Sequence, residues 1–320
     1  DGEGVMSPTY AQQHAPLENQ SEAVGHAVRA TYLYAAMADI AALKQKNSYT
    51  EALHRIWADI TDTRMHITGG LGAVHGIEGF GPQYLLPNAD AFNETCAAVG
   101  NVLFNFRMFL VHQDAKYLDV AEVSLLNNVL AAVNLEGNRF FYVNPLEADG
   151  KYPFNHGTAG RAPWFGTACC PSNMARLLPQ VQGMTYAHNE ENLYLAMYAD
   201  TSTLLKIAGT DLAINQITDY PNDGKIKISL NPKKPSSFKV HLRIPTWAGK
   251  QFVPGKLYKY LNQKKESWSL TVNGSKTQAK VEKGFAIIER KWKKGDQIIL
   301  DLPMPLRINQ CDKRVEENHN

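Results

Sequence analysis

The chain has 320 residues, of which 44% are hydrophobic and 20% are charged, a balance typical of soluble globular proteins with buried cores. Its length suits about two domains. The 33 basic and 31 acidic residues are interspersed and leave a net charge of +2, which gives no electrostatic basis for binding nucleic acid or an anionic membrane. No apolar run approaches the roughly 20 residues that span a bilayer. The polar first residues do not resemble a signal peptide.

Helical periodicity dominates the chain up to about residue 190. Apolar residues recur every three or four positions, and polar or glycine-bearing turns separate the periodic stretches. Such a series is typical of helical hairpins packed in layers. The predicted helices cover residues 21–44, 50–65, 91–112 and 116–135, and a further helix is expected to begin at Pro171.

A long segment between two of these helices, residues 68–88, contains six glycines and two prolines and shows little periodicity. Loops of this length without secondary structure are usually functional or disordered, and the aromatic and leucine side chains here argue against disorder. The only acidic residue of the segment is Glu78. On its own, Glu78 would most often be a solvated carboxylate, and His26 and His75 would most often be satisfied polar residues.

The hydrophobic period changes to two from about residue 190. Short runs of alternating or β-branched apolar residues are separated by Asn, Gly, Pro and Asp. Asn273-Gly274 and Lys294-Gly295-Asp296 have the chemistry of hairpin turns. We therefore expect a helical domain over residues 1–189, followed over residues 190–320 by an antiparallel β-sandwich of roughly six to eight strands.

Two of the four cysteines, Cys169 and Cys170, are adjacent and directly precede Pro171. Proline is favoured in the first helical turn, so the pair is expected at the positive end of a helix dipole, which lowers the pKa of a thiol. A disulfide between neighbours would be strained, and four cysteines are too few for a disulfide scaffold. Adjacent thiolates are better suited to binding a metal.

Glu94 and Cys96 are candidates to complete a metal site with this pair. Thiolates together with a carboxylate form a tetrahedral donor set that suits zinc. Because positions i and i+2 face different sides of a regular helix, these two side chains can share an ion only near a helix entrance or in irregular backbone. Three readings stay open from the residues alone: buried cysteines that act as small hydrophobes, a structural zinc site, and a thiolate nucleophile.

The sequence resembles glycoside hydrolase family 127, which includes β-L-arabinofuranosidases. The resemblance extends over nearly the whole chain in the order of the family, and its ETC and CCPSN elements are highly specific. It rests on AVGHAVRATYLYAAMAD (23–39), the segment 68–88, NETCA (93–97), NRFFYVNPL (138–146) and CCPSN (169–173), and on the later segments 219–232, 241–248 and 292–305.

This resemblance implies a helical catalytic domain of the (α/α)-barrel type, followed by the antiparallel β-sandwich. In the family, further helices precede the GHAVR helix and further β-structure follows the PMP strand. We therefore expect residues 1–189 to form a partial barrel that lacks its N-terminal helices, and residues 190–320 to form a sandwich that is incomplete at its C-terminal end.

The resemblance also implies roles for individual residues of a retaining glycosidase. Cys169 would be the nucleophile, and Glu78, which lies sixteen residues before Glu94, would be the general acid/base. Zn²⁺ would be held by Glu94, Cys96, Cys169 and Cys170, and sugar hydroxyls by His26, Glu122 and Tyr142. The acid/base loop reads GIEGFG (76–81), where family members commonly show Gly-Glu-Ala-Phe, so a related furanose is an alternative substrate.

We therefore expect an enzyme that releases a terminal furanose, β-L-arabinofuranose or a related plant-glycan sugar, from an oligosaccharide or glycan. The alternatives are a carbohydrate-binding relative with a structural zinc site and no turnover, and a hydrolase that uses metal-bound water. No nucleic acid or membrane partner is expected, and a homodimer is compatible with the sequence. An extracytoplasmic location such as the periplasm is favoured over the cytoplasm. Cys311 is expected to be a packing or surface thiol.

Overall fold

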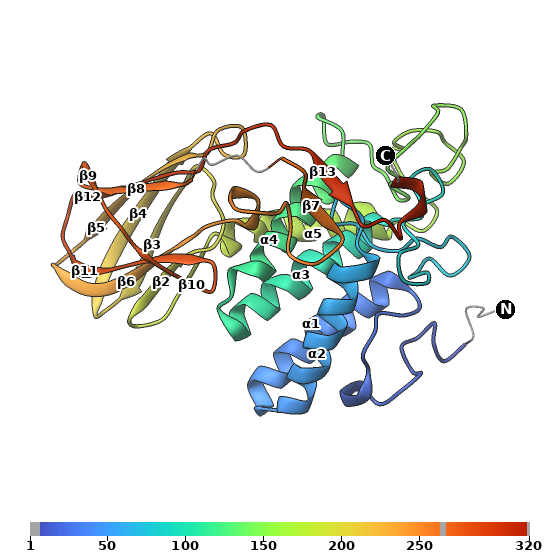
Figure 1. Ribbon diagram of the computed structural model, residues 1–320, viewed down its shortest axis with the longest axis horizontal. Coiled ribbons are helices and arrows are strands. Elements are labelled where there is room, and N and C mark those ends of the chain that lie inside the picture. Colours follow the sequence, from blue (N-terminus) through green and yellow to red (C-terminus); the bar gives the residue numbers. More distant parts are fainter. Residues whose placement is uncertain (1–6, 263–266, 319–320) are drawn as a thin grey trace.

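The computed structural model describes residues 7–262 and 267–318. Figure 1 shows a group of helices beside a β-sandwich, with the C-terminal part of the chain extending from the sandwich back over the helices. Within the described ranges, none of the helices combines the length and the apolar character that crossing a membrane requires. The α-helices are α1 (Ala27–Lys44), α2 (Asn47–Asp59), α3 (Thr95–His112), α4 (Ala115–Ser124) and α5 (Cys169–Val181).

Helix α3 lies at the centre of the helical part and contacts α1, α4 and α5. Its close approach to α1 depends on small residues, since α1 is rich in alanine and α3 carries Gly100. A Cβ added at Gly100 would lie 2.1 Å from Oγ1 of Thr31, so only glycine permits this spacing.

The five predicted helices are confirmed, but their boundaries differ from the periodic pattern. Helix α1 begins at Ala27 instead of residue 21, because Gly25 has a φ of 69° and its backbone packs against the carbonyls of Thr9 and Tyr10. The predicted helix 116–135 is α-helical only to Ser124 and continues as a π-helical turn and a short 3₁₀ turn. Helix α5 begins two residues before Pro171, so the cysteine pair lies inside its first turn.

The β-sandwich consists of two sheets around their own hydrophobic core. Among the strands that the structure describes, the pairs are antiparallel except β2 with β6, which is parallel. One sheet has the order β1 (Tyr186–His188), β2 (Asn192–Leu195), β6 (Ser236–Arg243), β11 (Phe285–Trp292), β10 (Lys280–Glu282). The other has the order β3 (Thr201–Ile207), β4 (Thr210–Thr218), β5 (Lys225–Pro232), β12 (Asp296–Asp301), β8 (Ser269–Val272), β9 (Ser275–Lys276).

The sandwich is confirmed, but the described residues contain more strands than the predicted six to eight, because these sheets have five and six. The strands include β3, which lies at a sheet edge and fully buries only Ile207. Asn273-Gly274 is confirmed as a hairpin turn, between β8 and β9. The turn at Lys294-Gly295 is instead a connection between the two sheets, because β11 and β12 belong to different ones.

A third, two-stranded sheet lies over the helices and not in the sandwich (Figure 1). It pairs β7 (Tyr258–Tyr260) with β13 (Asn309–Cys311). The Tyr258 hydroxyl donates to the carbonyl of Met65 at 2.8 Å, and Leu257 and Val315 join the helical core. Cys311 is half-buried in this sheet, and burial raises the pKa of its thiol to about 11, which is consistent with a packing role.

Candidate active site

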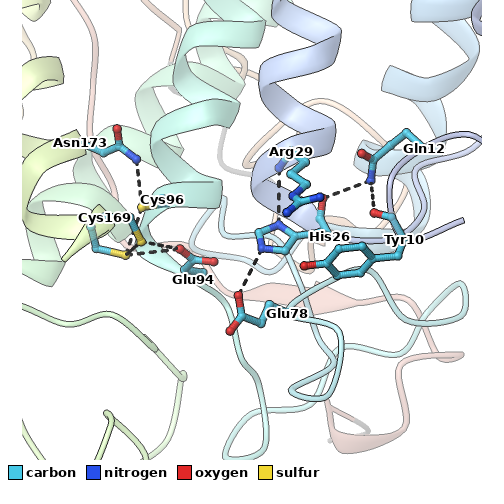
Figure 2. Close-up of polar contacts among 10 residues, drawn as sticks. Tyr10, Gln12, His26, Arg29, Glu78, Glu94, Cys96, Cys169 and Asn173 are labelled. Atoms are coloured by element: carbon cyan, nitrogen blue, oxygen red, sulfur yellow. Dashed lines mark hydrogen bonds and ion pairs between the residues drawn. The ribbon is translucent and has the colours of Figure 1, made fainter. Parts of the chain in front are cut away.

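The N-terminal ends of α3 and α5 converge and bring together the four predicted metal ligands. Figure 2 labels three of them, Glu94, Cys96 and Cys169. Glu94 is the N-cap residue of α3, yet its side chain caps no backbone amide and turns toward the cysteines. Cys96 is the second residue of α3, and Cys169 and Cys170 open α5. On a regular helix, side chains two residues apart face different sides. Glu94 and Cys96 can nevertheless face the same point, because Glu94 precedes the helix and Cys96 lies within it.

The donor atoms of the four side chains all lie within 4.8 Å of one another. The Sγ atoms of Cys96 and Cys170 are 3.1 Å apart, and those of Cys169 and Cys170 are 3.8 Å apart, so the adjacent thiols form no disulfide. Oε1 of Glu94 lies 3.4 Å from Sγ of Cys169 and 3.5 Å from Sγ of Cys170. Cys96 and Cys170 are fully buried, whereas Cys169 is half-buried.

The four titratable groups influence one another strongly. Burial, followed by the nearby Cys169, raises the pKa of Glu94 to about 8. Hydrogen bonds from Cys170 and Cys96 hold the pKa of Cys169 well below its usual value, and the Tyr142 hydroxyl contributes in the same direction. The pKa of Cys170 is raised, chiefly by burial. One thiolate is therefore stabilised at Cys169, while a second negative charge in the cluster is costly without a cation.

The donor set fits a zinc ion. Tetrahedral coordination with Zn–S bonds of about 2.3 Å places sulfur atoms about 3.8 Å apart, which is the distance between Cys169 and Cys170, whereas Cys96 and Cys170 are closer at 3.1 Å. Oε2 of Glu94 is buried and has no hydrogen-bond partner among residues 7–262 and 267–318. A buried carboxylate oxygen without a partner is destabilising, and a bound cation would satisfy it. Three soft thiolates and one carboxylate favour zinc over magnesium or calcium.

Glu78 approaches the same cluster from the glycine-rich loop. Its carboxylate, the His26 ring and Glu94 form a second group whose polar atoms lie within 4.8 Å of one another. The loop is fastened to the start of α1, because the amide of Ala27 donates to the carbonyl of Glu78 at 3.1 Å. Glu78 has a φ of 50°, a left-handed conformation that costs a non-glycine residue about 1 kcal/mol and is common at functional sites.

His26 orients the Glu78 carboxylate. It is the N-cap of α1, and its Nδ1 accepts from the amide of Arg29, so the neutral ring carries its proton on Nε2. That nitrogen lies 3.2 Å from Oε2 of Glu78 (Figure 2). Burial lowers the pKa of His26, which favours the neutral ring. Tyr10 contacts the edge of this ring at 5.5 Å between ring centroids.

Tyr142 is also placed at the site. The segment that carries it pairs with the start of α3, since the amide of Thr95 donates to the Tyr142 carbonyl at 3.0 Å. Burial raises the pKa of its hydroxyl, so Tyr142 is a neutral donor. His156 contacts the Tyr142 ring at 4.3 Å between centroids. His156 and Tyr10 were not predicted, because both lie in irregular segments without a motif.

The structure does not bring Glu122 to this group. Its carboxylate contacts the guanidinium of Arg243 and accepts from the Tyr220 hydroxyl at 2.8 Å. Arg243 also contacts Asp119 at 2.7 Å, so the two acidic residues of α4 bind one arginine of β6. Within the part of the chain that the structure describes, the hydrogen bonds of Glu122 go to these residues. A role in holding sugar hydroxyls therefore stays a prediction for Glu122, and its contacts instead join the helices to the sandwich.

Comparison with known proteins identifies relatives of both parts of the chain. Residues 1–183 match the family described as "Beta-L-arabinofuranosidase, GH127 catalytic domain", and residues 192–304 match "Beta-L-arabinofuranosidase, GH127 middle domain". A non-reducing end β-L-arabinofuranosidase of Bifidobacterium longum subsp. longum is 30% identical over 98% of this chain and 46% of its own length.

Solved structures give the same result. A GH127 β-arabinofuranosidase is 43% identical and superposes with a TM-score of 0.93 over 97% of this chain and 48% of that chain. A GH127 β-L-arabinofuranosidase from Geobacillus stearothermophilus T6 is 36% identical, with a TM-score of 0.87 over 97% of this chain and 47% of that chain. The chain thus spans about half the length of these relatives.

Proposed function

The chain belongs to the β-L-arabinofuranosidase family GH127, and from this premise we propose that it acts as a retaining glycoside hydrolase on a terminal β-L-arabinofuranoside or a related furanoside of a plant glycan. The observation that carries the proposal is the placement of one half-buried cysteine, Cys169, in a cluster of metal-binding groups that the carboxylate of Glu78 also approaches. A retaining enzyme needs these two functions, a nucleophile and an acid/base, beside the same glycosidic bond.

In the first step, the Sγ atom of Cys169 attacks the anomeric carbon of the bound sugar. The bond between that carbon and the glycosidic oxygen breaks, and its electron pair goes to the oxygen, which takes a proton from Glu78. The leaving alcohol departs, and the sugar is held by a carbon–sulfur bond to Cys169. The neutral His26 ring donates to Glu78 and keeps its carboxyl group in position for this transfer.

In the second step, the Glu78 carboxylate takes a proton from a water molecule, and the water oxygen attacks the anomeric carbon. The carbon–sulfur bond breaks and its electron pair returns to Cys169, which regenerates the thiolate. Two displacements at the same carbon give overall retention of configuration. The Tyr142 hydroxyl, which is not a metal ligand, contributes to lowering the pKa of Cys169, and a lower pKa makes this sulfur a better leaving group.

Glu94, Cys96, Cys169 and Cys170 would hold a zinc ion. Bound zinc would compensate the negative charge of the thiolates and keep them deprotonated at neutral pH. Four protein donors complete a tetrahedral site, which supports attack by a protein thiolate over attack by metal-bound water, because the latter needs an open coordination position. The same completeness is typical of structural zinc sites, so the alternative of a non-catalytic carbohydrate-binding relative has to be tested.

The proposal is tested by trapping the covalent intermediate. The metal-loaded protein is incubated with an L-arabinofuranose-configured cyclophellitol or bromoacetamide reagent, digested, and mapped by mass spectrometry. The expected result is one sugar adduct on Cys169, together with release of arabinose from a chromogenic β-L-arabinofuranoside. Cys169→Ser is expected to lose both, whereas Cys311→Ser, at the distant β13 strand, retains both. An adduct on another residue, or metal binding without an adduct or turnover on any furanoside, would contradict the proposal.

A further inference from the structure

Asn173, in the first turns of α5, contacts a sulfur of the metal-binding cluster although it is not a predicted ligand. It lies four residues after Cys169, so its side chain is on the same face of α5. Its Nδ2 atom donates to Sγ of Cys96 on α3 at 3.1 Å (Figure 2). Asn173 therefore links the two helices whose N-terminal ends form the cluster.

Arg176, one turn further along α5, determines which end of the amide faces the sulfur. Its Nη1 donates to Oδ1 of Asn173 at 3.2 Å. A guanidinium group can only donate hydrogen bonds, so the atom that it contacts has to be the amide oxygen. The amide NH₂ group then points to Cys96, and the positive charge of Arg176 polarises the amide in the direction that strengthens the N–H···S bond.

This hydrogen bond distinguishes Cys96 from Cys169. Cys96 is fully buried and accepts an amide N–H, whereas Cys169 is half-buried and accepts no amide N–H among residues 7–262 and 267–318; apart from the neighbouring thiols, the Tyr142 hydroxyl donates to it. A sulfur that accepts an N–H bond has less electron density available for attack on carbon. Three thiolates and a carboxylate also carry four negative charges, and a divalent ion cancels only two of them. The neutral amide of Asn173 offsets part of the remaining charge, and its NH₂ group does not compete for the metal.

We propose that Asn173, held by Arg176, is a positioning residue that keeps Cys96 as a permanent metal ligand and thereby leaves the role of nucleophile to Cys169. The inference rests on the proposed function, because that function defines the two roles of permanent ligand and nucleophile. The hydrogen bond itself, however, is a property of the metal centre and can be tested there. Partners of metal ligands orient those ligands and tune their donor strength, and their loss typically weakens metal binding by about 10- to 100-fold.

The first test measures metal affinity by competition with a chromophoric chelator. Asn173→Ala is expected to bind zinc about 10- to 100-fold more weakly than the unaltered protein. Asn173→Asp keeps the shape but replaces the donor with a carboxylate oxygen, and we expect a loss at least as large. Arg176→Ala, an exposed change, should give a smaller loss in the same direction. Gln180→Ala, which removes another amide from α5 that donates to the backbone, is the matched control and should leave the affinity unchanged.

The second test uses cobalt in place of zinc, which reports on the sulfur ligands by their charge-transfer absorption. Loss of the N–H···S bond makes the Cys96 thiolate easier to oxidise, so this absorption should move to lower energy in Asn173→Ala. Iodoacetamide labelling followed by peptide mapping gives an independent readout. In the loaded, unaltered protein the label should be on Cys169 and not on Cys96, and in Asn173→Ala it should also appear on Cys96; labelling of Cys311, a half-buried free thiol, is expected in both proteins and decides nothing.

The outcomes separate the inference from the proposed function. If the unaltered protein binds metal and cleaves furanosides while Asn173→Ala and Arg176→Ala show unchanged affinity, cobalt spectrum and labelling, the role of Asn173 is refuted and the proposed function stands. If the unaltered protein binds metal without turnover but the variants shift as expected, the inference stands and the proposed function does not. Should Asn173→Ala fail to fold, Arg176→Ala and Asn173→Asp decide the question by the same measurements.

Discussion

Nε2 of His26 lies 3.2 Å from Oε2 of Glu78, which connects the residue that begins α1 with the acidic residue of the glycine-rich loop. The contact depends on two local features. The N-cap position holds the His26 ring by its Nδ1 atom, and the left-handed backbone at Glu78 turns its carboxylate toward the cluster. Both features are needed for the contact, because a carboxylate on a loop is held in a productive position only when its partner is itself fixed.

Replacing His26 with asparagine should separate its role in the helix from its role at Glu78. Asparagine is a good N-cap residue, so α1 should keep its stability within about 0.5 kcal/mol. The shorter side chain cannot reach Glu78, and we expect kcat/KM for a furanoside to fall by about 100-fold. Steady-state kinetics and thermal unfolding check the two parts. His14→Asn, at an exposed position, is the control, and unchanged kinetics in His26→Asn would exclude the role.

Glu78→Gln should show whether this residue transfers protons. Loss of a general acid/base typically costs about 10²- to 10⁴-fold, and the loss should be largest for a natural oligosaccharide, whose leaving alcohol needs a proton. With a nitrophenyl leaving group the first step should be nearly normal, and added azide should restore turnover and yield a glycosyl azide with retained configuration. Glu51→Gln, on the exposed side of α2, should behave like the unaltered protein. Equal losses for both kinds of leaving group would argue against proton transfer by Glu78.

The Arg243 network should be important for stability. Arg243 is fully buried and contacts Asp119 and Glu122, so Arg243→Met leaves two buried carboxylates without a cation. Breaking a buried ion pair typically costs about 3–5 kcal/mol of the free energy of unfolding. Denaturation in urea measures the change. Lys239→Met removes an exposed pair with Glu289 and should cost less than about 1 kcal/mol, and a similarly small cost for Arg243→Met would contradict the prediction.

His66 should make the protein sensitive to acid. It is buried, and burial lowers its pKa from 6.5 to about 4. The folded state therefore binds fewer protons than the unfolded state between these values. The stability is complete above pH 6.5 and declines as the pH falls toward about 4. From pH 7 to pH 5 the contribution of His66 to this loss is about 2 kcal/mol.

Urea denaturation at both pH values, on the unaltered protein and on His66→Gln, isolates this contribution. Glutamine does not titrate, so the variant should lose about 2 kcal/mol less than the unaltered protein over the same interval. His188→Gln, at an exposed position of β1, is the control and should leave the pH dependence as it is. Parallel pH dependence in His66→Gln and the unaltered protein would show that burial does not depress the pKa of His66.

Much of the fold could be predicted from hydrophobic periodicity, because a helix or a strand has to present one apolar face to a core. The boundaries of the helices and strands could not be predicted in this way. The start of α1 depends on the close packing of Gly25 against carbonyls of residues 9 and 10, which no local pattern records. Likewise, the side chains of β3 alternate between partly buried and exposed, and only Ile207 is fully buried, so its hydrophobic pattern is weak and its place in the sheet is given by its pairing with β4.

For the site, too, some features could be predicted from the sequence and others could not. The adjacent cysteines before Pro171 predicted a metal-binding group at a helix N-terminus, and the structure places the pair there. Residues whose contribution depends on an orientation in space were not found, and Asn173 is the clearest example. Its motif position was known, but only the packing of α5 on α3 shows that its amide meets Cys96.

The sequence by itself determined the kinds of element, their order and the chemistry available at each motif, since these follow from side-chain type and local spacing. Only the tertiary structure decided which motifs share a site. It brought Glu78 close to Glu94, which belongs to the cysteine cluster, and it placed Glu122 against Arg243. The physical reason is that a meeting between distant residues depends on how whole helices and sheets pack. That packing is the sum of many small contacts along the chain, and no single residue or motif carries it.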